Sequence, residues 1–275
     1  MTRLKIIIVF GSKPNFDKDA FKYFILSLNK LQNTYEFCFP DLDGFPFEEQ
    51  VCVFETANQK IENFVSAQPK DYTHIIGIIT SRFDNNYFFN TTENSSIITT
   101  HIWDKYFSPP SLFEYLLHSI YCCLIYSQKT LPNREISDKA MAISIGSHSD
   151  TRGCVADFTR NKFDDRIDIA LGYICDEHKA EIIEVFGDEY LTETTFVLER
   201  KWIGNIEDKN SVAYNLKHIF KFDINKDSGF NKTWIDKVKE KFYDIPADLT
   251  GEVLKVVLTA LLTYYLIKFG LPPKS

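Results

Sequence analysis

Near the start of the chain, apolar residues first form a continuous run and then recur every three to four positions. Residues 5–10 form a short apolar run, which predicts a buried strand, and residues 17–31 carry apolar side chains three and four positions apart, which predicts a helix. The same order follows downstream, because we expect a second short strand over 35–39 and a second helix over 48–65. The chain therefore begins β, α, β, α, as α/β folds do.

The next apolar segments predict the middle of a sheet and a buried helix. Residues 74–80 are nearly all apolar, as expected of a central strand covered on both faces, and the β-branched residues 96–102 predict its neighbour. Ser111 is a natural N-cap with Glu114 at the capping-box position, so a helix over 111–127 should begin there. Because this helix is apolar around most of its circumference, we expect it in the core.

The second half of the chain is less regular. Further elements are predicted at residues 141–145 (a strand) and at 177–186, 231–242 and 249–269 (three helices). We expect an α/β domain over 1–186, followed by a helical C-terminal extension over 187–275.

The apolar helix predicted at 249–269 is a candidate contact element. Only 12 residues separate Lys255 from Lys268, whereas a hydrocarbon core needs about 20. A core helix or a subunit contact is therefore favoured over a membrane span. We expect a protein partner or a homo-oligomer through this helix, with membrane insertion as the alternative.

Composition and charge narrow the functional classes. With 44% hydrophobic residues, the 275-residue chain can bury a full core. Its net charge of −7, with no strongly basic stretch, disfavours a nucleic-acid partner. The first apolar run is too short for a signal-peptide core, which predicts a cytoplasmic protein. The six cysteines are then expected to be buried, reactive or metal-bound rather than disulfide-linked.

Four candidate metal ligands lie in a stretch rich in Gly, Cys and Asp at residues 146–178. His148, Cys154, Cys175 and His178 give the pattern H-x5-C-x20-C-x2-H. Zn²⁺ prefers four such donors in a tetrahedron, and a C-x2-H pair places two of them on one turn. We therefore predict a small zinc-knuckle module with a structural Zn²⁺. The alternative is that both cysteines are small buried residues and both histidines are solvated.

The helix over 111–127 carries a second candidate site. His118 and Cys122 are four residues apart and project from one face, the spacing of the two ligands in H-E-x-x-H. A metallopeptidase needs a glutamate directly after the first ligand to deprotonate the metal-bound water, and Ser119 stands there instead. Glu114 is the glutamate on this helix, one turn earlier. The alternative for His118 is a hydrogen-bonded histidine in a buried helix.

These segments together resemble the zincin fold, and specifically the archaemetzincin-like metallopeptidases. The central strand HIIGIIT at 74–80 precedes the helix, and the segment GCVADF at 153–158 and the motif CDEH at 175–178 resemble the family's later Cys-containing segment and terminal C-x2-C. The resemblance covers about residues 4–183. It implies a zincin-like mixed sheet with flanking helices.

In that family the helix supplies two catalytic zinc ligands and the general base, and a third histidine follows. By position, His118 and Cys122 match the ligands and Ser119 matches the base. Two of these three places hold a different residue type, so the resemblance implies a degenerate H-E-x-x-H helix and a pseudoenzyme.

Three functions follow as hypotheses. The first is a non-catalytic zincin-like protein that uses its structural zinc scaffold for protein binding or sensing. The second is an active zinc-dependent hydrolase, or peptidase, with a non-standard ligand set of His118, Cys122 and either His101 or His148. The third is a membrane-associated effector that acts through the helix at 249–269.

Overall fold

A computed structural model describes seven stretches of the chain: residues 3–11, 14–40, 47, 49–66, 72–127, 150–157 and 163–225. The chain divides into two compact units, Met1–Phe230 and Asn231–Ser275, and all the described residues belong to the first. The elements predicted at 141–145, 231–242 and 249–269 lie outside the described residues. The predicted boundary at residue 186 stays a prediction.

A five-stranded sheet forms the centre of this unit. Its strand order is β2 (Tyr35–Cys38), β1 (Leu4–Phe10), β4 (His74–Ile79), β7 (Ser95–Thr99) and β6 (Phe89–Thr91). The first four strands are parallel and β6 is antiparallel to β7, so the sheet is mixed. The predicted mixed α/β architecture is confirmed, and β4 is buried along its whole length, as its apolar sequence indicates.

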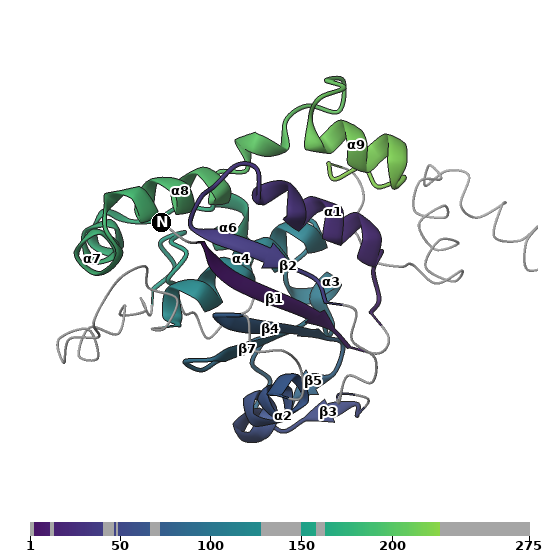
Figure 1. The fold of residues 1–275 in the computed structure, drawn as a ribbon, viewed down its shortest axis with the longest axis vertical. Coiled ribbons are helices and arrows are strands. Elements are labelled where there is room, and N and C mark those ends of the chain that lie inside the picture. Colours follow the sequence, from purple (N-terminus) through teal and green to yellow (C-terminus); the bar gives the residue numbers. More distant parts are fainter. Residues whose placement is uncertain are drawn as a thin grey trace, which may run out of the picture. The chain divides into compact units, whose positions relative to one another are not determined.

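Helices cover both faces of the sheet, and successive residues of β1 explain why. Ile6 and Ile8 pack into one hydrophobic core with α1 (Lys18–Leu28) and α4 (Leu112–Tyr126). The alternate residues of β1 pack into a second core against α2 (Phe54–Ser66). This is the period of two that a strand imposes on its side chains. Figure 1 shows α1 and α4 on one side of the sheet and α2 on the other.

Of the remaining described helices, one short helix precedes α4 and the others follow it in the chain. They are α3 (Trp103–Tyr106), α6 (Asp165–Leu171), α7 (Asp176–Phe186), α8 (Asp188–Leu198), the 3₁₀ helix η2 (Lys201–Ile203) and α9 (Val212–Ile219). None of the helices in the described part of the chain has the length and hydropathy that a membrane span needs.

Two predicted boundaries differ from the structure. Strand β3 (Val51–Cys52) occupies the start of the helix predicted at 48–65, because it pairs with β5 (Arg82–Phe83) in a separate two-stranded sheet. The strand predicted at 96–102 ends at Thr99, and Ile102 has a left-handed backbone (φ 45°) that turns the chain into α3. Pairings of two residues are too short for apolar periodicity to reveal.

Helix α4 begins at the predicted capping box. The Oγ of Ser111 accepts the N–H of Glu114 at 3.3 Å, and a carboxylate oxygen of Glu114 accepts the N–H of Ser111 at 2.8 Å. The other oxygen of Glu114 forms an ion pair with Arg200 at 3.0 Å. Every α4 residue except Glu114 and Tyr126 is buried, so this cap orients the most buried helix of the described fold.

Ser111→Ala should lower the free energy of unfolding by about 1 kcal/mol, because the N-terminal amides of α4 lose their side-chain acceptor. Urea denaturation followed by circular dichroism measures the change. Thr192→Ala is the control, because Thr192 is an exposed hydroxyl within a helix that bonds only to the carbonyl of Asp188. Equal stability of the two variants would contradict the role of the cap.

Candidate metal centre

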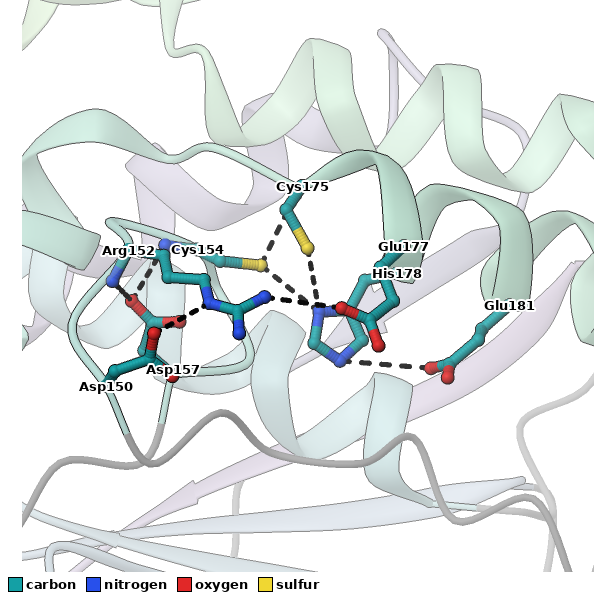
Figure 2. Close-up of polar contacts among 8 residues, drawn as sticks. All are labelled: Asp150, Arg152, Cys154, Asp157, Cys175, Glu177, His178 and Glu181. Carbon is teal, nitrogen blue, oxygen red and sulfur yellow. Dashed lines mark hydrogen bonds and ion pairs between the residues drawn. The ribbon is translucent and has the colours of Figure 1, made fainter.

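Two cysteines and a histidine of the predicted ligand set lie together at the start of α7. The sulfur atoms of Cys154 and Cys175 lie 3.4 and 3.2 Å from Nδ1 of His178, and the three donor atoms all lie within 4.8 Å of one another. Figure 2 shows both thiols directed at this ring nitrogen. The fourth predicted ligand, His148, lies outside the described residues.

Helix α7 carries two of these donors on its first turn. Cys175 is the N-cap, with an extended backbone (φ −69°, ψ 161°), and His178 follows three residues later. The C-x2-H spacing therefore places a sulfur and an imidazole side by side on one turn, with Sγ of Cys175 3.2 Å from Nδ1 of His178.

Backbone pairing brings Cys154 to the same place from more than twenty residues away. Cys154 forms a parallel β-bridge with Tyr173, and the N–H of Val155 donates to the carbonyl of Tyr173 at 2.8 Å. The N–H of Cys175 donates to the sulfur of Cys154 at 3.3 Å. A carboxylate oxygen of Asp157 accepts the N–H of Cys154 at 3.1 Å. The loop is thus fixed on both sides of its sulfur.

A glycine makes the turn that delivers the second cysteine. Gly172 ends α6 with a left-handed backbone (φ 56°), and its N–H donates to the carbonyl of Asp168. A Cβ at this position would clash with the backbone carbonyl of Leu198. Only glycine satisfies both conditions, so the chain can turn here from α6 to Tyr173 and Cys175.

The carboxylate of Glu181 lies on the side of the His178 ring that faces away from the two sulfurs. The Nε2 of His178 is 3.8 Å from an oxygen of Glu181, one turn further along α7. A metal-binding histidine commonly directs its other ring N–H to a carboxylate, which fixes the tautomer and raises the basicity of the ligand nitrogen. With the proton on Nε2, the Nδ1 lone pair of His178 faces the two sulfurs.

The residues present suit Zn²⁺. Two cysteine sulfurs and an imidazole nitrogen are the donors that zinc prefers. A tetrahedral ion with bonds of about 2.3 Å to sulfur and 2.0 Å to nitrogen separates these atoms by about 3.5 Å. The separations of 3.2 and 3.4 Å at Nδ1 are close to that value. In the part of the chain that is described, no other group of three such side chains converges in this way.

The second predicted site lies on α4, in a cavity of about 540 Å³. His118, Ser119 and Cys122 line it. Burial lowers the pKa of His118 to about 3, so its imidazole is neutral at physiological pH. Burial also raises the pKa of Cys122 well above its ordinary value, and its thiol donates to the carbonyl of Val155 at 3.5 Å. These two side chains are therefore a neutral imidazole and a protonated thiol.

The other candidates from the sequence lie elsewhere. The carboxylate of Glu114 accepts from Ser111 and pairs with Arg200, as described above, so it caps α4 rather than facing the cavity. His101 lies in the turn after β7 and is not one of the described residues that line the cavity. Neither residue joins His118 and Cys122 in a group of converging donors.

Three aspartates that the sequence motifs did not single out line the same cavity: Asp157, Asp165 and Asp168. Asp165 and Asp168 are three residues apart on α6, a helical spacing that places both on one face. Burial, and then the nearby carboxylates of Asp157 and Asp165, raise the pKa of Asp168 to about 8. The i, i+3 spacing of these two aspartates was the sequence signal that could have pointed to this cavity. The same spacing is common on solvated helix surfaces, so it does not distinguish a site from an ordinary surface.

Comparisons with known proteins give one structural similarity. No family model matches the chain, and no curated protein matches it. Among solved structures, the chain is similar to archaemetzincin from Methanopyrus kandleri, with 11% sequence identity and a TM-score of 0.42. The match covers 68% of this chain and 97% of that one. A similarity of this degree does not assign the chain to a family.

The raised pKa of Asp168 predicts a pH-dependent stability. The folded pKa of about 8 lies above the unfolded value of 3.8, so the folded state holds an extra proton between these pH values and its stability falls as pH rises through that window. The melting temperature should fall from pH 6 to pH 9, and less steeply in Asp168→Asn. Exposed Asp104→Asn is the control. Parallel curves for wild type and Asp168→Asn in differential scanning fluorimetry would contradict this assignment.

Proposed function

We propose that this chain is a zinc-stabilised binding protein, built on a catalytically degenerate zincin-like scaffold, whose metal has a structural role. The convergence of Cys154, Cys175 and His178 carries the proposal. In it, two thiolates and a neutral imidazole hold the ion, and His148 is the fourth ligand. Zinc in such a site cross-links the loop before α6 to the start of α7, which supplies folding free energy.

The composition of α4 supports binding rather than catalysis. Hydrolysis by a zincin needs a carboxylate beside the metal-bound water, and Ser119 occupies that position on the helix. The carboxylate of Glu114 bonds to the N-cap residue Ser111 through one oxygen and pairs with Arg200 through the other. From the sequence pattern alone, we also propose that a protein partner contacts the C-terminal extension and that the protein is cytoplasmic.

One observation favours a second candidate, a zinc-dependent hydrolase with non-standard ligands. His118 and Cys122 line a cavity together with Asp165 and Asp168, and such donors bind catalytic metals. Their donor atoms do not form a group of three within 4.8 Å among the described residues, so a metal there would require rearrangement or a ligand from outside them. Metal content after His118→Ala separates the two candidates.

Purified protein should contain one zinc per chain, and Cys175→Ser should lose it, because one of the three converging donors is removed. Inductively coupled plasma mass spectrometry measures the metal, and the melting temperature should fall with it. Cys38→Ser is the matched control, since Cys38 lies on β2 away from the cluster. Metal-free wild type, or full zinc content in Cys175→Ser, would sink the structural-zinc proposal. Zinc lost in His118→Ala and kept in Cys175→Ser would favour the hydrolase.

Glu181→Gln should weaken zinc binding about 10- to 100-fold while leaving the fold intact, because the carboxylate 3.8 Å from Nε2 of His178, which we expect to accept its N–H in the zinc-bound protein, is replaced by a neutral amide. Competition with a chromophoric chelator measures the dissociation constant. Glu184→Gln, an exposed change on the same helix, should bind zinc as the wild type does. Identical affinities for both variants would show that Glu181 does not support the ligand.

A further inference from the structure

The cavity on α4 is lined by two chemically different kinds of side chain. Most of the lining is apolar, and its aromatic members are Phe54, Tyr87, Phe88, Phe89, Tyr115 and Tyr126. Carboxylates of Asp157, Asp165 and Asp168 line the cavity as well. A volume of about 540 Å³ is in the range of small-molecule sites, which combine apolar walls with a few polar groups.

Two of the carboxyl groups that line the cavity are largely screened from water. Asp165 is 6% exposed and Asp168 is 2% exposed. Burial and the neighbouring carboxylates raise the pKa of Asp168 to about 8, and no positively charged group is among the causes of the shift. A bound cation would stabilise the ionised form of Asp168, which would then release its proton.

A buried histidine on α4 gives an independent indication of a ligand. His118 is only 9% exposed, lines the cavity, and its Nδ1 has no hydrogen-bond partner in the described part of the chain. Burying such a nitrogen without a partner costs free energy, so buried polar groups in native proteins are normally paired. Because the imidazole is neutral, Nδ1 can act as an acceptor, as carboxylates do. The cavity is therefore suited to a ligand that donates several hydrogen bonds.

The size of the cavity and the spread of the donors favour an organic cation over a metal ion. No three donor atoms of the described cavity residues lie within 4.8 Å of one another, so a metal coordination shell is not assembled. A carbon skeleton would instead fill the volume against Tyr126 and the other aromatic side chains, which offer it an apolar surface.

We propose that this cavity binds a small organic cation, a primary alkylamine, with its ammonium group against Asp165 and Asp168 and its alkyl chain against the aromatic side chains of the lining. The ammonium group can come from a free amine or from a lysine side chain. In either case three N–H donors face carboxylates and the neutral imidazole of His118. The inference does not rest on the metal centre, whose ligands are a separate set of residues.

Isothermal titration calorimetry on the zinc-loaded full chain tests this, with pentylamine as the probe, pentanol as its neutral counterpart and Nα-acetyl-lysine methylamide as the lysine probe. Pentylamine should bind at one site per chain, and pentanol at least tenfold more weakly. Asp168→Asn and Asp165→Asn should each weaken pentylamine binding at least tenfold, whereas Asp104→Asn should not. Stronger binding of the lysine derivative than of pentylamine would identify a lysine side chain as the source of the ammonium group.

Four outcomes would overturn the proposal: no saturable binding of either amine, equal binding of pentylamine and pentanol, wild-type affinity in both folded aspartate variants, or a second zinc per chain that Asp168→Asn removes. Circular dichroism shows whether the aspartate variants fold. Because zinc content is measured separately through Cys175→Ser, failure of amine binding leaves the proposed structural zinc untouched.

Discussion

Burial of α4 against the sheet is the constraint on which the other features depend. Almost every side chain of this helix is inside, so its position and rotation are set by packing on both sides. Because α4 is apolar around most of its circumference, packing alone would allow the helix to rotate slightly about its axis. The capping box and the ion pair from Glu114 to Arg200 fix its N-terminal end, and the bond from Cys122 to Val155 ties its other half to the loop that carries Cys154.

That loop connects the candidate metal centre to the cavity. Asp157 uses one carboxylate oxygen to hold the backbone of Cys154, and the same residue lines the cavity beside Asp168. Val155 likewise accepts the Cys122 thiol with its carbonyl while its N–H pairs with Tyr173. An ion held by Cys154 would therefore stiffen one wall of the cavity. The two sites share a structural element while their chemistry differs: soft donors at one and carboxylates at the other.

Two buried histidines differ in how the fold pairs their ring nitrogens. His118 and His74 stay neutral because burial lowers their pKa values to about 3 and about 4. His74 has partners, since Ser96 and Ser127 lie 2.7 and 3.1 Å from its two ring nitrogens. His118 has none at Nδ1 within the described residues. His118 lines the cavity, whereas His74 does not.

Local sequence by itself determined the central elements of the fold and part of the local chemistry. Apolar periodicity predicted β1, α1, β2, β4 and α4, and Ser111 with Glu114 predicted the cap, because these signals lie within one or two turns of chain. The C-x2-H motif likewise placed Cys175 and His178 on one turn of α7. The sequence also predicted Cys154 as a ligand, but only the tertiary structure brings its sulfur to the other two donors. Tertiary structure alone decided that Asp157, Asp165 and Asp168 meet His118 in one cavity. It also decided the pairing of β3 with β5. These are contacts between distant segments, and their free energy comes from burial and backbone pairing across the fold, which no short stretch of sequence encodes.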